Sequence, residues 1–493
     1  MDKNNNPVIQ QHTMQSIVYI ILAIYIAVHC VISWIFRRVK KDSQDFFLAG
    51  RNLGVIPIGL SVMVTTFSAV NYLAMPGEIA SQGLYMLASL PAFFLAAWPV
   101  AKYWMPRFLE MRPVSVYAFL EERFDGKVRL LCAVLFLVWR LFWMAVALYA
   151  SCKIMHLLTG MDLLWLLLLC SIVATAYSSI GGMKAVVWTD VLQFCVLFGS
   201  IIVGIALSCH GGDFWQILLE NGKLRPFSPV DWQYLSFNPQ IRITLWSALL
   251  GSFVTFLTRF GGDQMVMQRY LSAKSLSAAQ KGLWLNAVAA TFSIGLLALF
   301  GLALAVFAHR NGLPAGTPPV KIMGMLLKSF PAGGAGLLAA GLLAATMSSI
   351  DSGLNSCVAT ITVDFLERGK LKRISPAIMT LLLAIPVTLC AAFVLPALNA
   401  KQSMFVLLNK TVNVMGTPLL VVMICALFMK RISASAVFYG TILGTILTLF
   451  AGFFLKSLSL HYYALLSLLC CFVCIIIFKF IHRFTQIDTD SIK

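Results

Sequence analysis

The stretch GVIPIGLSVMVTTFSAVNYLAMPG, residues 54–77, decides the fold that the sequence predicts. It is apolar and long enough to cross a membrane, yet glycine, proline, threonine, serine and asparagine interrupt it. The stretch LWSALLGSFVTFLTRFGGDQMVMQRY, residues 245–270, is interrupted similarly by Gly251, Arg259 and two adjacent glycines. Broken helices at matching positions of two halves are typical of membrane proteins built from inverted repeats. Because irregular backbone is tolerated at membrane depth only where it lines a cavity, we expect each break to line a cavity.

Composition supports a membrane protein along the whole chain. Of 493 residues, 60% are hydrophobic and 11% are charged, against a usual charged share of about 25%. Continuous apolar windows of about 20 residues, each able to cross a hydrocarbon core of about 30 Å, recur from end to end. We therefore expect an all-α polytopic membrane protein with about 13 transmembrane helices, at roughly 15–36, 54–73, 83–106, 128–152, 162–180, 187–209, 241–263, 281–308, 335–364, 374–395, 404–429, 432–455 and 460–481.

The expected domain organisation follows from the two broken spans, which stand five spans apart. Residues 1–53 form the first transmembrane helix and a cytoplasmic loop. Residues 54–430 form a core of two five-helix inverted repeats, at about 54–209 and 241–430. Residues 431–493 form two C-terminal helices and a tail.

The net charge of +18 comes from Lys and Arg that collect in alternate loops. The main clusters are RRVKK at 37–41, the segment 107–129, QRYLSAK at 268–274, ERGKLKR at 367–373, the pair at 430–431 and the C-terminal tail. By the positive-inside rule these loops are cytoplasmic, which places the N-terminus outside and the C-terminus inside a cell (inner) membrane. No basic face remains outside these loops, so nucleic acid is not an expected partner.

The stretch AATMSSIDSGLNS, residues 344–356, concentrates oxygen atoms in an apolar span. On a helix, Ser348, Asp351, Ser352 and Asn355 share one face. A hard monovalent cation prefers such oxygen ligands. Close packing of small residues is the alternative explanation, but it does not account for Asp351, because a carboxylate in mid-membrane costs about 2.5–3.5 kcal/mol. Asp190, at the start of the sixth span, either favours its helix dipole or joins the same ion site.

Five segments resemble the signature segments of the sodium:solute symporter family. They are DFFLAGRNLG at 45–54, FLEERFDG at 119–126, GGMKAVVWTDVLQ at 181–193, QRYLSAKS at 268–275 and AATMSSIDSGLNS. The resemblance implies a leucine-transporter-type fold and sodium as the coupling ion. It also implies a principal sodium site made of the backbone carbonyls of Val64, Phe67 and Ala345 and the hydroxyls of Ser348 and Ser349.

The pattern is similar to the bacterial sialic acid branch of the family, which implies a second sodium site. Asp190, Ser348 and Ser352 match that branch, and Asp351 stands where the branch has a serine. The extra carboxylate of Asp351 either tightens the site or, when protonated, leaves it empty.

Two arginines, Arg140 and Arg259, lie within expected spans and not in the basic loops. Arg140 lies deep in the fourth span, so its side chain would have to extend far along the helix to reach a membrane interface. A buried guanidinium fits a carboxylate in bidentate fashion, so Arg140 is expected to meet either a substrate carboxylate or a permanent partner such as Glu78 or Asp263. In the sialic acid branch an arginine at this position holds the substrate carboxylate. Arg259 falls where a sugar-transporting relative has a gate tyrosine, and is expected to be a substrate or gate residue.

The break of the second span supplies the remaining expected substrate contacts, Thr66, Ser68 and Asn71. Together these features predict a symporter that couples inward sodium movement to uptake of a small organic anion, with sialic acid (N-acetylneuraminate) or a related carboxylated solute as the best candidate. A neutral sugar, a monocarboxylate or an amino acid remains an alternative, and an ion channel a remote one, because repeated polar rings are missing. Scattered histidines and the lack of a G-x-S-x-G motif argue against an enzyme.

Overall fold

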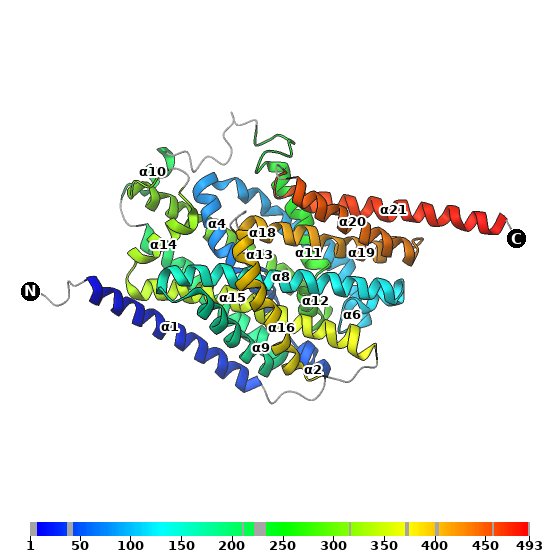
Figure 1. Cartoon of the computed structure of the whole chain (residues 1–493), viewed down its shortest axis with the longest axis horizontal. Coiled ribbons are helices and arrows are strands. Elements are labelled where there is room, and N and C mark those ends of the chain that lie inside the picture. The colour runs from blue at the N-terminus through cyan, green and yellow to red at the C-terminus, as the bar shows by residue number, and fades with distance from the viewer. Residues whose placement is uncertain are drawn as a thin grey trace, which may run out of the picture.

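The computed structural model describes residues 7–36, 43–209, 212–220, 233–314, 317–369, 374–399, 404–455 and 458–491. Figure 1 shows that these residues form a bundle of helices with the N- and C-termini at opposite ends of its long axis. The helices are α1 (Pro7–Phe36), α2 (Ser43–Leu48), η3 (Ala49–Arg51), α3 (Val55–Thr66), α4 (Ala69–Gln82), η4 (Leu84–Ser89), α5 (Pro91–Pro99), η5 (Val100–Trp104), α6 (Met105–Met111), α7 (Ala118–Arg123), α8 (Gly126–Thr159), α9 (Leu163–Ser208), α10 (Phe214–Glu220), η6 (Ser247–Gly251), α11 (Ser252–Gly261), α12 (Gln264–Leu271), α13 (Leu276–Arg310), α14 (Pro319–Ser329), α15 (Ala332–Thr360), η7 (Ile361–Glu367), α16 (Pro376–Leu389), η8 (Cys390–Val394), α17 (Leu395–Asn399), α18 (Met404–Thr411), η9 (Val412–Gly416), α19 (Thr417–Phe428), α20 (Ala434–Phe454) and α21 (Tyr462–Ser491).

The all-α membrane architecture expected from composition is confirmed. Among the described residues, 10 helices are long and apolar enough to cross a membrane, or 11 when the bent pair α3 and α4 is taken as one span. The 46 residues of α9 contain two of the expected spans, since a straight helix of this length would reach about 69 Å. The exact count of 13 is not established by these lengths and stays a prediction.

The second expected span is broken, as its sequence indicated. The axes of α3 and α4 differ by 73°. Between them, Phe67 (φ −95°, ψ 102°) and Ser68 (φ −88°, ψ 162°) adopt extended backbone. The amide of Phe67 still donates to the carbonyls of Met63 and Val64, at 3.0 and 3.2 Å. The carbonyls that follow lose their helical partners because the chain no longer continues in the helix direction.

The seventh expected span is also divided. The π-helical turn η6 leads into α11, which ends at Gly261, and α12 begins after Gly262 and Asp263. Asp263 caps α12 by accepting a hydrogen bond from the amide of Met265 at 3.0 Å. A side-chain cap of this kind satisfies one of the free amides at a helix start, which makes the break a stable feature of the fold.

Backbone hydrogen bonds join the two broken helices at the ends that are expected to face the cytoplasm. The amide of Leu53, just before α3, donates to the carbonyl of Ser272 at 3.0 Å. The amide of Lys274 donates to the carbonyl of Leu53 at 3.1 Å. These two bonds form a short parallel bridge between Leu53 and Ala273, residues that are 220 positions apart in the chain.

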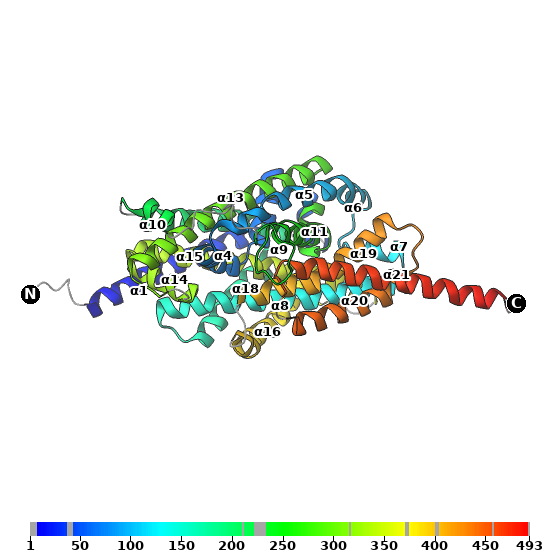
Figure 2. The ribbon, with the colours of Figure 1, turned by 90° about the horizontal axis from the view of Figure 1, so that it is seen from above.

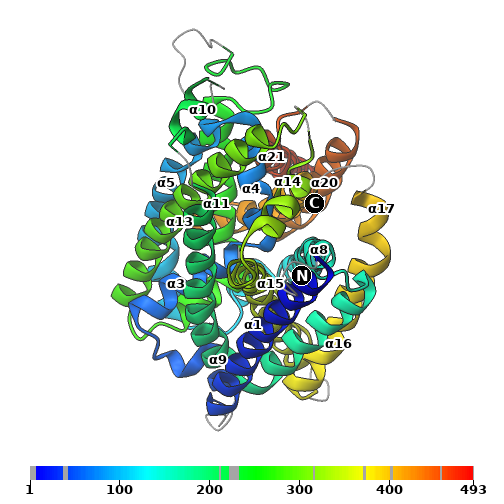
Figure 3. The ribbon, with the colours of Figure 1, turned by 90° about the vertical axis from the view of Figure 1, so that its left-hand side faces the viewer.

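Helix α15, which carries the serine-rich stretch, lies in the interior. Figures 2 and 3 place it between α5 and α13 on one side and α16 on the other. Its apolar window within Ala332–Glu367 is 83% buried, the highest share of any candidate span. The N-terminal helix α1 packs against α9 and α15 (Figure 3).

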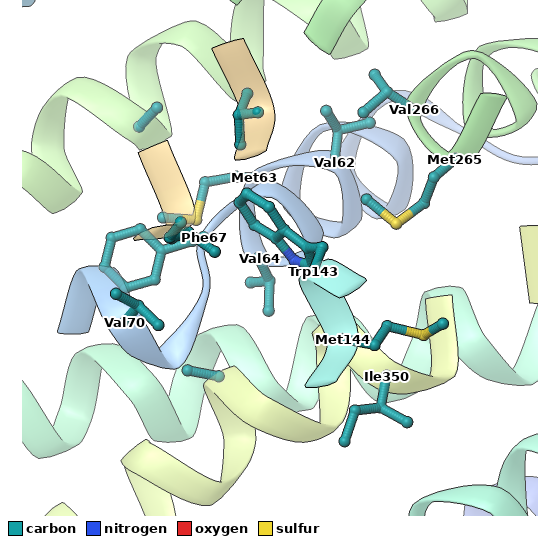
Figure 4. Close-up of a cluster of buried hydrophobic side chains, with 14 of the residues drawn as sticks. Val62, Met63, Val64, Phe67, Val70, Trp143, Met144, Met265, Val266 and Ile350 are labelled. Atoms are coloured by element: carbon teal, nitrogen blue, oxygen red, sulfur yellow. The ribbon is translucent and has the colours of Figure 1, made fainter. Parts of the chain in front are cut away.

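Apolar side chains enclose the break between α3 and α4. Figure 4 shows Met63, Val64 and Phe67 at the break, with Trp143 of α8 and Ile350 of α15 beside them. All five are buried, with exposed fractions of 6% or less. The polar backbone of the break is therefore held in a largely apolar surrounding, where unpaired polar groups are costly.

Gly182 in α9 provides a test of this fold. Its backbone (φ 63°, ψ −168°) is open essentially to glycine alone. A Cβ atom there would lie 2.8 Å from a ring carbon and 2.9 Å from the carbonyl oxygen of Phe46. We expect Gly182→Ala to lower the free energy of unfolding by about 1–3 kcal/mol, seen as a lower melting temperature of the detergent-solubilised protein.

Gly199→Ala, in the same helix, is the matched control. A Cβ at Gly199 meets no atom within 4 Å, and the backbone there is helical. This variant should keep or slightly raise the melting temperature, because alanine favours a helix interior over glycine by about 1 kcal/mol. Equal melting temperatures for the two variants would contradict the break at Gly182.

Candidate ion and substrate site

The residues expected to form the principal sodium site meet where α3 breaks beside α15. The hydroxyl of Ser348 lies 3.2 Å from the carbonyl oxygen of Val64 and 3.1 Å from that of Ala345. The hydroxyl of Ser349 lies 3.1 Å from the same Ala345 carbonyl. Phe67, the fifth expected ligand, is the first residue of the break. Four of the five residues are thus joined by direct contacts, in a buried group of oxygen atoms that suits a hard monovalent cation.

The residues expected to form a second sodium site are arranged differently, because two of them bind a buried arginine. The Nη2 atom of Arg269 donates to Asp190 Oδ2 at 2.9 Å and also to the hydroxyl of Ser352. Its Nε atom donates to the hydroxyl of Ser61 at 2.6 Å. Ser61 and Thr65 in turn donate to Asp190 Oδ2, at 2.5 and 3.2 Å. The Asp190–Arg269 pair is fully buried, with no exposed side-chain surface on either partner.

The other two expected members of that site lie apart from Arg269. Ser348 takes part in the oxygen cluster at the α3 break. Asp351 accepts a hydrogen bond from the hydroxyl of Tyr177 at 2.8 Å and one from the amide of Ser352 at 2.5 Å. The four residues are therefore neighbours on α9 and α15, but the guanidinium group of Arg269 binds two of them, Asp190 and Ser352.

Arg269 was missed because its segment, QRYLSAK, was counted as a basic cytoplasmic loop. This assignment is wrong: Arg269 belongs to helix α12 and has an exposed fraction of 0%. Gln264 and Gln268, one turn apart on the same helix, are equally buried. Polar residues at helical spacing directly after a glycine break were the signal that could have placed this segment inside the protein.

Arg140 has an internal partner, which is one of the two alternatives that the sequence left open. Its guanidinium pairs with Asp263, and both side chains are 2% exposed. The guanidinium carbon also lies 4.7 Å from the ring centre of Trp139 and 5.6 Å from that of Trp143. The expected contact between Arg140 and a substrate carboxylate therefore has a competitor within the protein.

Arg259 has a different surrounding. Its Nη1 atom donates to the carbonyl of Thr66, at the break, at 3.0 Å. Its guanidinium carbon lies 5.1 Å from the ring centre of Trp143. Within the described part of the chain, no carboxylate lies within ion-pair distance of Arg259. The contacts that stabilise the positive charge are thus a carbonyl and an aromatic face, rather than a carboxylate at ion-pair distance.

A cavity opens on Arg259 and on the break. Its polar lining includes Thr66, Asn71, Ser89, Thr255 and Arg259. Its apolar lining includes three methionines and three phenylalanines, at positions 63, 75, 86, 67, 93 and 256. Concave sites with mainly apolar walls and a few convergent polar groups are typical of small-molecule binding.

The expected substrate residues at the break fall into two groups. Thr66 and Asn71 line the cavity, although the Thr66 hydroxyl donates to the carbonyls of Val62 and Met63 in its own helix. Ser68 is fully buried and is not part of the cavity lining; its hydroxyl has no hydrogen-bond partner. The structure therefore brings Thr66, Asn71 and Arg259 together around one cavity, whereas Ser68 lies outside its lining.

A second cavity adjoins the first, since Met86 and His461 line both. Glu78 and Arg242 form an ion pair in its wall, and Lys410 lies beside them. These residues belong to segments that the positive-inside rule places on the external side. The two cavities therefore meet at Met86 and His461, between the Glu78–Arg242 pair and Arg259.

On the opposite side, which is expected to be cytoplasmic, ion pairs between charged side chains hold several segments together. Arg129 pairs with Asp364 and Glu121 at 2.6 Å each, and Arg368 pairs with Glu121 at 2.9 Å. The hydroxyl of Ser115 donates to Asp364 at 2.6 Å. Hydrogen bonds from Arg368 and Arg129 hold the pKa of Glu121 below its ordinary value, so the carboxylate keeps its charge at neutral pH. This network links α7, α8 and η7.

Comparisons with known proteins identify the family of this chain. The model of the sodium:solute symporter family matches residues 46–444. Sodium-coupled monocarboxylate transporter 1 of Mus musculus is 30% identical over 68% of this chain, and the alignment spans 56% of that protein. The sodium/sialic acid symporter SiaT of Proteus mirabilis is 26% identical, with 93% of this chain and 94% of SiaT aligned.

A solved structure shares the fold over nearly its whole length. It is a substrate-bound, outward-open state of a Na⁺-coupled sialic acid symporter, 24% identical, with a TM-score of 0.82. The match covers 93% of this chain and 96% of that one. Because the family model covers most of the sequence and the fold agrees, the chain belongs to the sodium:solute symporter family.

Proposed function

We propose that this protein couples inward sodium movement to the uptake of a small organic anion, with sialic acid or a related carboxylated solute as the best candidate. One observation carries the proposal: the same helix break contributes the Val64 carbonyl to the serine cluster and the Thr66 carbonyl to Arg259. A cation site and a site for an anion thus lie two residues apart on one segment. Occupation of either site changes the backbone that forms the other, which is the physical basis of coupling.

Sodium is the coupling ion of this family, and the cluster at the break supplies the chemistry to bind it. Carbonyls freed at a helix break, together with hydroxyls from a facing helix, are how transporters of this architecture hold sodium. The hydroxyls of Ser348 and Ser349 both contact the Ala345 carbonyl. An arriving ion would take the place of these contacts and draw α3 and α15 together.

Arg259 is the better candidate for the substrate anion than Arg140. A guanidinium that already pairs with a buried carboxylate has little to gain from a second one, whereas an unpaired guanidinium beside a cavity gains a full ion pair. Arg140 pairs with Asp263, and Arg259 has a carbonyl partner only. We therefore assign the contact with the substrate carboxylate to Arg259 and a structural role to Arg140.

A monocarboxylate is the second candidate substrate. The methionine and phenylalanine side chains of the cavity suit a short apolar body better than a polyol. A neutral sugar would leave the charge of Arg259 without a partner, which is unfavourable in a largely apolar site.

The arrangement of cavities supports outward access, with the N-terminus outside and the C-terminus in the cytoplasm of a cell (inner) membrane. The cavities reach Arg259 from the side of Glu78 and Arg242. The network around Arg129 binds the other side. Transport then requires this network to open after sodium and substrate have bound.

Loss of either serine hydroxyl should weaken sodium binding. Ser348→Ala and Ser349→Ala each remove one ligand of the proposed site. We expect the sodium concentration at half-maximal thermal stabilisation to rise about tenfold, which corresponds to about 1.4 kcal/mol. Ser356→Ala is the control, because Ser356 is not a proposed ligand and its hydroxyl bonds to the carbonyls of Ser352 and Gly353, two turns along α15 from the Ala345 carbonyl. Unchanged sodium dependence in both site variants would place the ion elsewhere.

The two arginines can be separated by stability and by transport. A thermal-shift screen of N-acetylneuraminate, lactate, glutamate and glucose, with and without sodium, first selects the solute. Arg259→Gln should fold and bind sodium, yet lose at least tenfold in affinity for an anionic solute. Arg140→Gln should unfold at lower temperature, since removing one partner of a buried pair costs about 3–5 kcal/mol.

The double variant Arg140→Gln/Asp263→Asn decides between the assignments. It removes both charges of the buried pair, so it should recover much of the stability and retain solute uptake in proteoliposomes. A folded double variant that loses uptake, together with an Arg259→Gln variant that keeps it, would return the carboxylate contact to Arg140.

A further inference from the structure

The connection between α20 and α21 reaches into the helix bundle where the two cavities lie. Its residues 458–461, here named the α20–α21 turn, directly precede α21. The amide of Ser459 donates to the carbonyl of Pro239 at 2.6 Å, and its hydroxyl donates to the carbonyl of Arg242 at 2.8 Å. The turn is therefore fixed to the segment that carries Arg242, a residue in the wall of the second cavity.

The end of the turn next to α21 is seated against the start of α11. A Cβ atom at Gly251 would lie 2.1 Å from the carbonyl oxygen of His461, so glycine is needed for this close approach. The side-chain amide of Asn413 in η9 donates to the carbonyl of Leu460 at 3.4 Å and accepts a hydrogen bond from the hydroxyl of Thr255 at 2.8 Å. Contacts with three separate segments thus define the position of His461.

The side chain of His461 lies where the two cavities meet. It lines both of them, as Met86 does, and it is partly exposed. Among the described residues, the imidazole has one side-chain hydrogen-bonding contact, between its Nδ1 atom and the hydroxyl of Ser252 at 3.5 Å. This distance is longer than that of an ordinary hydrogen bond. Because imidazole has two ring nitrogens that donate or accept, His461 can offer a hydrogen bond to a solute in the cavities.

The size of the cavities decides which solutes reach His461. The cavity beside Arg259 measures about 90 Å³ and the one beside Arg242 about 260 Å³. Sites that enclose drug-sized molecules measure about 300–1,000 Å³. A short monocarboxylate is small enough for the cavity beside Arg259 alone. A carboxylated sugar is not, so its polar body must extend past Met86 and His461 into the second cavity.

We propose that His461 is a specificity-determining residue that hydrogen-bonds the polar body of a carboxylated sugar whose carboxylate is held by Arg259. The inference rests on the proposed uptake of an organic anion and narrows it to a solute that spans both cavities. The α20–α21 turn lies beyond residue 444, where the match to the family model ends. The turn therefore adds a contact from outside the part of the chain that this model describes.

The two residues recognise different parts of the solute. Arg259 binds the charge that all the candidate anions share, so it does not distinguish a sugar acid from a short monocarboxylate. A polar group placed for a distant hydroxyl or amide does distinguish them, because a solute that lacks this group leaves the polar group of the protein without its partner. Selectivity among anions is thus expected to come from His461.

Replacement of His461 should weaken binding of the sugar acid alone. In purified full-length His461→Ala at saturating sodium, we expect the dissociation constant of N-acetylneuraminate to rise about fivefold, through the loss of one hydrogen bond. Isothermal titration calorimetry measures this constant. The dissociation constant of lactate and the sodium concentration at half-maximal thermal stabilisation should not change. His461→Asn keeps a donor and an acceptor and should recover part of the lost affinity.

His309→Ala is the matched control. His309 is an exposed histidine in the last turn of α13, and it is not among the residues that line either cavity. This variant should bind N-acetylneuraminate, lactate and sodium like the native chain.

The outcomes separate the inference from the proposed function. Unchanged affinity for N-acetylneuraminate in His461→Ala, or a native chain that binds lactate and not N-acetylneuraminate, would overturn the role of His461 and leave the uptake of an organic anion intact. An equal loss of affinity for the sugar acid, for lactate and for sodium would show that His461 only supports the fold, which also overturns the inference. A native chain that binds neither solute would overturn the proposed function as well.

Discussion

The whole site depends on backbone carbonyls at a helix break, where the regular hydrogen bonds of the helix end in a largely apolar surrounding. At membrane depth an unpaired carbonyl costs several kcal/mol, so a break in a helix must bring partners with it. Here the break of α3 is met by one hydroxyl of α15 at Val64 and by a guanidinium of α11 at Thr66. The groups proposed to recognise a cation and an anion are thus the groups that satisfy the broken helix.

Two buried arginines and one partly buried arginine show how one residue type serves three purposes. Arg269 joins three helices through Asp190 and two hydroxyls. Arg140 is neutralised by Asp263 among aromatic rings. Arg259 keeps its charge available at a cavity. The number of carboxylates beside each guanidinium, and not its burial alone, distinguishes a structural arginine from one that can recognise a ligand.

The fold followed from local patterns in the sequence, and the residues proposed for the principal ion site followed from the resemblance to the family's signature segments. Glycine and small polar residues inside an apolar span marked both breaks, and helical spacing placed the serines on one face. The ion-pair partners of the arginines could not be predicted, because they come from segments distant in the sequence and local residue spacing does not indicate such contacts. Asp263, for example, lies 123 positions from Arg140. Arg269 was misplaced because a basic residue near a span end has the same local appearance in a loop and in a buried helix.

The parallel bridge between Leu53 and Ala273 ties together the segments that enter α3 and leave α12. The two broken helices therefore share one backbone joint, at the start of α3 and the end of α12. A hinge motion that displaced only one of them would have to sever this joint. A displacement of either segment is therefore passed on to the other for as long as these two hydrogen bonds hold.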